Sequence, residues 1–561
     1  MSDIAIPMRR VLVIGLDGGT LDVLLPLVRD GQLPHLKRVM DNGAWGKLRT
    51  VVPPGTGPAW SSIITGLDPS NHGIADLIVR AENSYDLAFL NASSLRAPTV
   101  WDLVGQFGGE VVVLNVPMTY PARPVNGVMI TGLDTPADAT DCAYPRDLLQ
   151  SARSTDPAYR INPEEPYVPG KEAGFVAELT SLARARGHVL THLLEQVPWK
   201  FAMQVFSETD FLQHAVWHTM DRTHPRYRAG DEAKCRPGII EFYRTLDRLI
   251  GQAADLLGND GSLVILSDHG AGPLHEFIHA NNALLAAGAM KVRRRPLSWI
   301  KYWAFRAGFT PLRAYRVGAA RRLGKARMGL RWSSKGYNLL RRFFFSFSDI
   351  DWARTKAYAV SGGVYGGMFV NLRGREPSGI VPPDQYDKVR QELKQLLLGF
   401  RHPRTGKPLI KQVVMREELY GGRFLEELPD LYFLPSDPTQ AVFGDFEFSS
   451  NRVVESASSA ISAQHRMDGI LIVKGAGIKP RADLAGMTVM DVLPLILYLM
   501  GLPIPEGLDG RFKPAIFEEQ ETAGRPARYF RMEGGDYAGK HRRATDDESL
   551  KQRLKGLGYI S

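Results

Sequence analysis

Short, unbroken runs of apolar residues recur along the chain, and most are followed by a polar or Gly-rich turn and a helical pattern. Runs without alternating polar positions are typical of strands that are buried on both faces. They lie at Val11–Leu16, Glu110–Leu114, Val128–Thr131, Phe201–Phe206, Ser262–Leu266 and Ile470–Val473. Helical periodicity is found at Leu21–Arg29, Leu33–Asp41, Phe175–Gln196, Ile239–Leu257 and Tyr386–Leu398. The pattern predicts an α/β fold with a mostly parallel central sheet and helices on both faces.

The alternation of strands and helices is interrupted in the second half of the chain. A chain of 561 residues exceeds the size at which a single hydrophobic core stops growing, so we expect more than one structural unit. We predict a core formed by residues 1–275 and 451–515, with an insertion at 276–450 and a polar C-terminal extension at 516–561. The insertion is expected to begin with a basic helical cap over about 277–348 and to continue as a small α/β subdomain.

The positive charge of the chain is concentrated in this cap. Between Phe277 and Ser348 there are sixteen Lys or Arg residues and no Asp or Glu, whereas the whole chain carries +9, so the other residues sum to −7. We favour a helical cap whose charges attract small anionic substrates. The interleaved Trp, Tyr and Phe residues also suit peripheral contact with an anionic membrane or polymer, which stays the alternative. No groove-reading motif is found, so specific nucleic-acid recognition is not expected.

The cysteines and the apolar segments limit the class of protein. Cys142 and Cys235 are the only cysteines, too few for a disulfide framework or a Cys-rich zinc module. The first apolar run ends at Asp17, too early for a signal peptide core. No apolar segment reaches the roughly 20 residues that span a bilayer. With 44% hydrophobic and 23% charged residues, the composition is that of a globular protein, which we expect in the cytoplasm.

Polar side chains follow three of the predicted strands at the point where each strand ends. Asp17 follows the first strand, Asp210 and His214 follow the fourth, and Asp268 and His269 follow the fifth. In an open α/β sheet, ligands bind beyond the carboxyl ends of the strands. Asp210 and His214 stand four residues apart, so a helix would place them on one face. Because carboxylates and imidazoles together suit divalent cations, the sequence predicts a metal site at this edge of the sheet.

A threonine in the segment Val52–Gly66 is the candidate nucleophile. Thr56 follows two prolines and a glycine, and Pro58 stands in what would be the first helical turn, so we expect Thr56 to be an N-cap residue. The free amides and the dipole of a helix N-terminus favour an anion such as phosphate. A capping role without catalysis is the alternative. A cation nearby would make the threonine alkoxide accessible at neutral pH.

In this order and spacing, the motifs resemble the alkaline phosphatase superfamily, on the branch of the type I phosphodiesterases and nucleotide pyrophosphatases. The resemblance rests on LDGG at Asp17, TGPAW with Thr56, TGLDPSNHGI over Thr65–Ile74, Asp210-x-x-x-His214, Asp268-His269-Gly270 and AQHRMDGILIVKG with His465. The segment GGMFVNLRGREPSGIV is similar to a subdomain of the bacterial predicted phosphohydrolase or phosphomutase group. The resemblance covers about residues 10–275 and 450–515.

The resemblance implies an alkaline phosphatase-like core with two divalent metal ions, zinc first and manganese as the alternative. One metal would be held by Asp17, Thr56, Asp268 and His269, and the other by Asp210, His214 and His465. Thr56 would attack phosphorus and form a phosphothreonine intermediate, which implies hydrolysis of phosphodiester or pyrophosphate bonds in a small anionic, phosphate-containing substrate. A phosphomutase or phosphotransferase at the same site is one alternative. A non-catalytic module that binds anionic surfaces is the other.

The chain departs from the related families at two points. Many nucleotide pyrophosphatases have an Asn shortly after the HGI segment that hydrogen-bonds the phosphoryl oxygen, whereas Asp76 and Leu77 stand here, which leaves that donor unassigned. Neither cysteine lies in a C-x-P-S-R motif, so sulfate ester hydrolysis through formylglycine is excluded. Of the other histidines, His72 is expected to position a helix end through a hydrogen bond, and His218 to lie on a helix surface.

Overall fold

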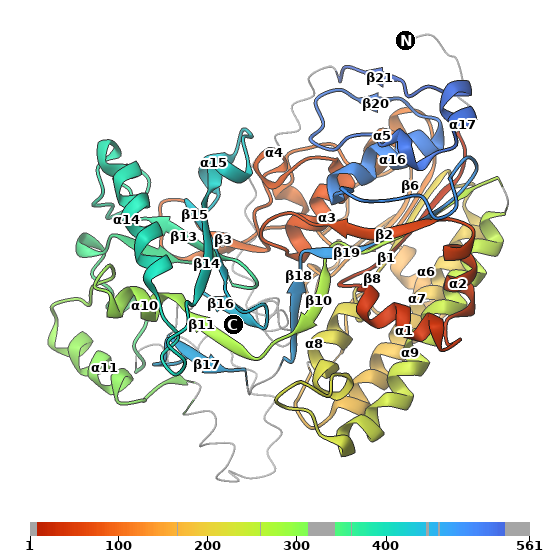
Figure 1. Ribbon diagram of the computed structural model, residues 1–561. Coiled ribbons are helices and arrows are strands. Elements are labelled where there is room, and N and C mark those ends of the chain that lie inside the picture. Colours follow the sequence, from red (N-terminus) through yellow and green to blue (C-terminus); the bar gives the residue numbers. More distant parts are fainter. Residues whose placement is uncertain are drawn as a thin grey trace.

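The protein is described by a computed structural model that covers residues 8–532, except 165–166, 259, 312, 314–342, 361, 445–447 and 458–460. A larger lobe is built on the central sheet, and a smaller lobe lies beside it (Figure 1). Much of the predicted basic cap (314–342) and the end of the predicted C-terminal extension (533–561) lie outside the described residues. The domain boundaries stay a prediction.

A mixed sheet of eight strands forms the centre of the larger lobe, in the order β2-β19-β9-β1-β8-β5-β6-β7. The five strands from β9 to β6 are parallel to one another, whereas β19 and β7 run antiparallel to their neighbours. The bounds are β1 Val11–Leu16, β2 Ala44–Arg49, β5 Val111–Val116, β6 Gly127–Thr131, β7 Ala143–Tyr144, β8 Phe201–Phe206, β9 Ser262–Leu266 and β19 Asp468–Lys474. This order makes the ends of β9, β1 and β8 neighbours.

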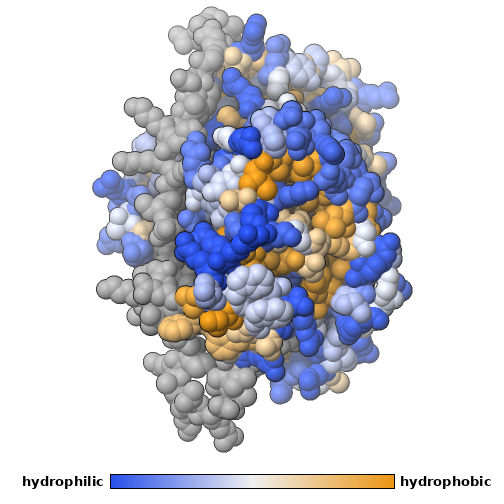
Figure 2. All heavy atoms as spheres, turned by 90° about the vertical axis from the view of Figure 1, so that its left-hand side faces the viewer, coloured by the Kyte–Doolittle hydropathy of each residue, from blue (hydrophilic) through white to orange (hydrophobic). Residues whose placement is uncertain are grey.

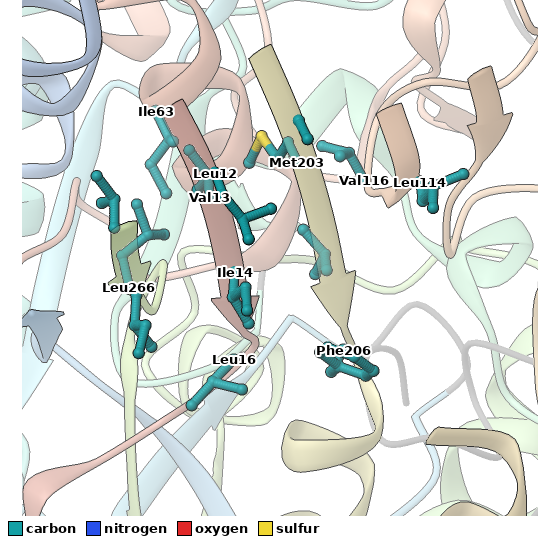
Figure 3. Packing of buried hydrophobic residues seen from close by; sticks show 14 of the residues in the cluster. Leu12, Val13, Ile14, Leu16, Ile63, Leu114, Val116, Met203, Phe206 and Leu266 are labelled. Carbon is teal, nitrogen blue, oxygen red and sulfur yellow. The ribbon is translucent and has the colours of Figure 1, made fainter. Parts of the chain in front are cut away.

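Both faces of β1 are covered, which explains its unbroken apolar sequence. All of its residues are buried, and each buried Val, Leu or Ile contributes about 1.5–3 kcal/mol to folding. Leu12, Val13, Ile14 and Leu16 lie among side chains of β8, of β9 and of the neighbouring helix α3, Thr56–Thr65 (Figure 3). Gly15 leaves room for an α3 side chain, because a Cβ there would lie 2.4 Å from Cη2 of Trp60.

Helices cover both faces of this sheet (Figure 1). On one face, α7 (Glu172–Gln196) and α9 (Ala229–Leu257) pack against each other and against the central strands; on the other lie α3, α5 (Val100–Gln106) and α16 (Val492–Met500). The lobe also contains α1 Leu21–Arg29, α2 Pro34–Asp41, α4 Pro69–His72, α6 Leu148–Thr155, α8 Glu208–Met220 and α17 Glu519–Gly524. The predicted α/β fold class is thereby confirmed. Among the described residues, no helix is long and apolar enough to span a bilayer.

The smaller lobe is built on an antiparallel sheet of four strands, in the order β12-β13-β15-β14, against which α14 packs. A second sheet has the order β16-β11-β17. The bounds are β11 Glu276–His279, β12 Ala357–Ala359, β13 Gly366–Val370, β14 Ile410–Met415, β15 Leu431–Pro435, β16 Gln440–Phe443, β17 Val454–Ser456, α10 Ala280–Ala286, α11 Pro296–Arg306, α14 Tyr386–Gly399 and α15 Arg416–Leu419. Helix α11 lies at the outer end of this lobe, at the lower left of Figure 1.

The sequence pattern missed the edges of the central sheet and the start of one helix. The strand β2 contains Gly46 and Lys47 and is only partly apolar, and β7 has two residues, so neither shows a strand pattern. The strand β2 pairs with β19, which is distant in sequence, and β7 pairs with β6. Both strands therefore depend on a neighbouring strand and not on their own sequence pattern. Helix α9 begins ten residues before the predicted start at Ile239. The sequence pattern missed these residues because the first turns are polar and include Pro237.

Candidate active site

Five of the predicted site residues meet at the carboxyl ends of β9, β1 and β8. Asp17 directly follows β1, and Asp268 and His269 follow β9. Helix α8 begins just after β8 and carries the other two, with His214 Nε2 lying 3.3 Å from Asp210 Oδ2. All five side chains are buried. The predicted convergence of these residues at one edge of the sheet is therefore observed.

Thr56 joins the cluster from the first residue of α3. The N-cap of this helix is Gly55, which is extended and makes no side-chain capping bond, so the prediction that Thr56 is the N-cap is wrong by one residue. Because its hydroxyl does not cap the helix, it is available to the cluster, and Oγ1 lies 3.2 Å from His269 Nε2. Pro58 has no N–H group, so the amides of Thr56 and Gly57 are the donors at this helix end.

His465 reaches the cluster through a short antiparallel ladder. It lies on β18 (Ala463–Arg466), which pairs with β10 (Gly270–Pro273), the strand that directly follows His269. The register sets His465 opposite Ala271. Its ring stacks on that of His269, with centroids 3.7 Å apart, and its Nε2 lies 3.7 Å from Asp210 Oδ1. The ladder thus adds a third imidazole to the residues at the strand ends.

The three imidazole rings are oriented in the same way relative to the cluster, with Nδ1 toward a backbone carbonyl and Nε2 toward the other site residues. In each ring Nδ1 lies at hydrogen-bond distance from a backbone carbonyl: 2.8 Å for His214 with Ala463, 3.1 Å for His269 with Gly270, and 3.0 Å for His465 with Pro54. A carbonyl oxygen only accepts, so Nδ1 carries the proton in the neutral ring and Nε2 keeps its lone pair. All three Nε2 atoms face the cluster, which is the arrangement that metal-binding histidines adopt.

The carboxylates also have free ligand capacity. Trp60 Nε1 donates to Asp17 Oδ2 over 3.4 Å, and the amide of Gly18 donates to Asp268 Oδ1 over 3.2 Å. The second oxygens, Asp17 Oδ1 and Asp268 Oδ2, are buried and accept no hydrogen bond from any residue that the structure describes. The nitrogen beside them is His269 Nε2, 3.2 Å from Asp268 Oδ2 and 3.7 Å from Asp17 Oδ1. Carboxylate oxygens at zero exposure are costly unless a cation or a proton neutralises them.

Among the residues that the structure describes, two sets of three ligand atoms lie close enough to hold an ion. One set comes from Asp17, Asp268 and His269, the other from Asp210, His269 and His465, and within each set the atoms lie within 4.8 Å of one another. Both sets are buried and share His269. The buried oxygens without donors and the inward-facing Nε2 atoms fit divalent cations, and both cysteines lie elsewhere.

The pKa values of the cluster show how burial and charge oppose each other. Burial, followed by the negative charges of Asp268 and Asp210, raises the pKa of Asp17 well above its usual range. Burial also opposes ionisation of Asp210, but the charge and hydrogen bond of His214 outweigh it and lower its pKa. Burial and a neighbouring imidazole lower the pKa of His465 well below its usual range, which favours the neutral ring. Cations placed among these groups would relieve the repulsion between the carboxylates.

The two other histidines have different outcomes. His72 lies at the end of α4, accepts a hydrogen bond at Nδ1 from the amide of Ile74, and lies 3.0 Å from Ser62 Oγ of α3, in line with the predicted positioning role. The prediction that His218 lies on a helix surface is wrong. It is buried, because α7 and the segment around Ser462 cover α8, and its Nδ1 lies 3.1 Å from Ser462 Oγ.

Residues that support the cluster were not identified from the sequence. Trp60 stands in the TGPAW segment, and its indole reaches Asp17 because Gly15 leaves room for the ring. On α8, the hydroxyl of Thr209 donates to the carbonyl of Asp17, and Gln213 donates to the carbonyl of Gly18 over 2.9 Å. The available signal was their position beside Asp210 and His214 on the same helix, but their partners are distant in sequence.

The segment that departs from the nucleotide pyrophosphatases lies against the start of α3. A Cβ on Gly57 would lie 3.0 Å from Cδ2 of Leu77, so this leucine covers the residue next to Thr56. The amide of Leu77 donates to Asp76 Oδ1 over 2.7 Å. An apolar, buried side chain thus stands at this position, and it provides no side-chain donor for a phosphoryl oxygen.

Comparison of the backbone with solved structures finds similar folds. A phosphonoacetate hydrolase from Sinorhizobium meliloti 1021 in complex with phosphonoformate has a TM-score of 0.53 and 15% identity, with 88% of this chain and 96% of that chain covered. Its complex with phosphonoacetate gives 0.51 at the same identity and coverage. Human ectonucleotide pyrophosphatase / phosphodiesterase 5 has a TM-score of 0.48 and 13% identity, with 90% and 98% covered. At these identities the first two show the shared fold.

Comparison with protein families gives the more specific result. Residues 11–448 match the family described as type I phosphodiesterase / nucleotide pyrophosphatase. The match spans most of the chain. It includes the ends of β1 and β9, which position Asp17 and Asp268, and the helices α3 and α8, which carry Thr56 and Asp210. The chain therefore belongs to the type I phosphodiesterase / nucleotide pyrophosphatase family of the alkaline phosphatase superfamily, and it is a hydrolase that acts on phosphoric ester bonds.

Proposed function

We propose that the protein is a metal-dependent phosphohydrolase that cleaves phosphodiester or pyrophosphate bonds with Thr56 as the nucleophile. One observation carries the proposal: the Thr56 hydroxyl lies at the N-terminus of α3, 3.2 Å from His269 Nε2, within a buried cluster of carboxylates and imidazoles. A hydroxyl in this position meets the two requirements of a phosphoryl nucleophile, a means of losing its proton and an adjacent site for an anion.

Two divalent metal ions are proposed for the cluster, zinc first and manganese as the alternative. Asp17, Thr56, Asp268 and His269 would hold one ion, and Asp210, His214 and His465 the other. His214 takes the place of His269 in the second set of three close ligand atoms, and its Nε2 lies 3.3 Å from Asp210 Oδ2 and 3.1 Å from His465 Nε2. When bound, such ions lower the pKa of a hydroxyl or a water and stabilise negative charge on oxygen. The donor set of oxygens and imidazoles, without a thiolate, suits both metals.

The chain's own residues then have distinct tasks. Thr56 Oγ1, having lost its proton, attacks phosphorus, and its bond to phosphorus forms as the bond to the leaving oxygen breaks. The resulting phosphothreonine still carries the second substituent of the substrate phosphorus. A water molecule then attacks the phosphothreonine, restores the Thr56 hydroxyl and releases the phosphoryl product. The amides of Thr56 and Gly57 would donate to the equatorial oxygens of the phosphoryl group, and Trp60 holds Asp17 in place over 3.4 Å.

The experiment compares the wild-type protein with Thr56→Ala and Thr56→Ser on bis(p-nitrophenyl) phosphate, after metal removal and readdition of Zn²⁺ or Mn²⁺. We expect metal-dependent hydrolysis by the wild type, a loss of about a thousandfold or more in Thr56→Ala, and partial activity in Thr56→Ser, which retains a hydroxyl. Acid-quenched wild type should carry a p-nitrophenyl phosphoryl group on the peptide that contains Thr56, because attack on the diester releases only one of the two p-nitrophenolates.

Two results would overturn the proposal. Full metal-dependent hydrolysis by Thr56→Ala would reject the nucleophile while leaving the metal site intact. Product analysis in the presence of glycerol separates hydrolysis from transfer, because a phosphotransferase would place the phosphoryl group on the alcohol and release little free product. Metal content measured on each variant shows that a loss of rate does not come from a loss of metal.

A further inference from the structure

Helix α11, Pro296–Arg306, packs on the smaller lobe with polar side chains buried and apolar side chains exposed. Its buried side chains include Ser298 and Lys301, together with Phe305. Three of its large apolar side chains face outward: Leu297 is 63% exposed, Ile300 65% and Trp303 63%. A helix at the surface of a globular protein normally does the reverse. The inversion leaves an apolar stripe in contact with water at the outer end of the lobe (Figure 1).

A buried carboxylate holds the helix in this orientation. Ser298 Oγ donates to Asp349 Oδ1 over 2.9 Å, and Lys301 Nζ lies 3.3 Å from Asp349 Oδ2. Asp349 also accepts from the amide of Ser346 over 3.2 Å. Phe305 packs against Phe345, with ring centroids 5.2 Å apart. Rotating α11 to bury its apolar stripe would expose Phe305 and leave the Asp349 carboxylate buried without its cation, so the outward stripe is built into the fold.

The stripe is part of a larger apolar patch that is bordered by arginines. Residues next to it in sequence or on the following segments are also exposed: Trp299, Phe309 and Phe343. Arg294, Arg295 and Arg306 are exposed at the two ends of the helix, and none forms an ion pair with another described residue. Figure 2 views this side of the molecule and shows hydrophobic surface beside strongly hydrophilic residues.

We propose that this patch, formed by α11 and its flanking arginines, docks on the surface of an anionic lipid bilayer. An interfacial helix lies in the membrane plane with its apolar face in the headgroup region, and Trp is favoured at that depth. Arginines at both ends of the helix match anionic headgroups, and the absence of Asp and Glu from residues 277–348 removes repulsion. A polyanion in water would bind the arginines but would leave Leu297, Ile300 and Trp303 exposed to water.

The experiment is co-sedimentation of the full chain with vesicles of phosphatidylglycerol and phosphatidylcholine, compared with pure phosphatidylcholine. We expect binding to the anionic vesicles only. Ile300→Ser/Trp303→Ser should weaken it about tenfold or more, because it removes the apolar anchor. Arg294→Gln/Arg295→Gln should weaken it roughly fivefold for each charge removed. Hydrolysis of a small soluble diester should be unchanged in both variants, which shows that they fold.

Matched controls separate binding through the patch from nonspecific hydrophobic and electrostatic binding. Val168→Ser removes an exposed apolar side chain elsewhere, and Lys234→Gln/Lys411→Gln removes two exposed charges on α9 and β14; both variants should bind as the wild type does. Brominated lipids should quench the fluorescence of the wild type, and Trp303→Phe should keep the binding and lose part of the quenching.

Three results would reject the proposal. The first is wild-type protein that does not bind anionic vesicles. The second is binding that survives in the Ile300→Ser/Trp303→Ser variant, which would place the contact on other basic residues or describe a purely electrostatic polyanion site. The third is a concentration-dependent dimer that the same variant abolishes in the absence of lipid, which would make the patch an interface between two copies of the chain.

Discussion

His214 Nε2 and His465 Nε2 face each other over 3.1 Å, although Nδ1 of each ring already lies at hydrogen-bond distance from a backbone carbonyl. In the neutral rings this places two lone pairs against each other. Two acceptors at that distance repel unless a cation lies beside both or a proton is added. The two lone pairs therefore favour a positive charge beside both rings. The carbonyls of Ala463 and Pro54 hold the rings in the orientations that turn both Nε2 atoms toward each other.

The first prediction concerns metal removal and this histidine pair. We expect chelation to lower the melting temperature of the wild type and readdition of Zn²⁺ to restore it, because bound metal stabilises the folded state. His465→Ala should bind less metal per chain, show a smaller restoration and lose most activity. Metal analysis, thermal unfolding and hydrolysis are the measurements.

A matched control for His465→Ala is His188→Ala, which removes an exposed histidine outside the cluster. It should change neither the metal content nor the zinc-dependent shift in melting temperature. Equal metal content in His465→Ala and the wild type would contradict the assignment of His465 as a ligand.

The second prediction uses two glycines with left-handed backbone. Gly18 has φ +65° and Gly31 has φ +73°, so alanine at either position is strained by about 1–2 kcal/mol. At Gly18 the added Cβ would also lie 2.6 Å from Asp210 Oδ1, whereas at Gly31 it would meet nothing within 4 Å. Gly18→Ala should therefore lose metal and activity, and Gly31→Ala should lose only stability. Similar activity losses in the two variants would show that strain, and not the contact with Asp210, is responsible.

The third prediction concerns the pH dependence of stability. Burial lowers the pKa of His72 to about 3 from an ordinary value of 6.5. Between these values the unfolded chain binds a proton that the folded chain does not, so this group's contribution to stability is present above pH 6.5 and is lost as the pH falls toward 3. In His72→Asn, the free energy of unfolding should fall less steeply with decreasing pH, by about 1.4 kcal/mol per pH unit.

Urea unfolding of the wild type and His72→Asn at several pH values between 4 and 6.5 measures this slope. The denaturant m-value should be equal in the two proteins, since the surface exposed on unfolding does not change. Parallel pH profiles for the two proteins would contradict the prediction.

The fourth prediction concerns the buried pair that orients α11. Lys301 and Asp349 have side-chain exposures of 9% and 6%. Lys301→Met leaves the carboxylate buried without its cation and should reduce the free energy of unfolding by about 3 kcal/mol. Asp349→Asn in the same chain removes the uncompensated charge, so the double variant should recover much of that loss. Additive losses in a double-mutant cycle would show that the two groups do not act as a pair.

The sequence by itself determined the central strands and the residues at their ends. The run Val11–Leu16 is apolar throughout because β1 is covered on both faces, and its bounds agree with the observed strand. The same applies to Phe201–Phe206 and Ser262–Leu266. Since parallel strands end at one edge, Asp17 and Asp268 could be placed together from local patterns alone.

Tertiary structure decided which distant residues complete the site. His465 lies 251 residues after His214, and no local pattern links them; the ladder between β10 and β18 brings them together. The capping role expected of Thr56 depended on a helix boundary, and a shift of one residue left its hydroxyl available to His269. Both outcomes depend on hydrogen bonds between segments that are far apart along the chain.

Tertiary structure also decided which face of a helix is buried. Residues 297–305 lie in the predicted helical cap, but an apolar stripe by itself predicts burial. For α11 the partner on the lobe is the Asp349 carboxylate, which binds Ser298 and Lys301 and turns the apolar side chains outward. The sequence pattern of a single helix describes its own two faces, whereas the side that is buried depends on the polarity of the surface it packs against.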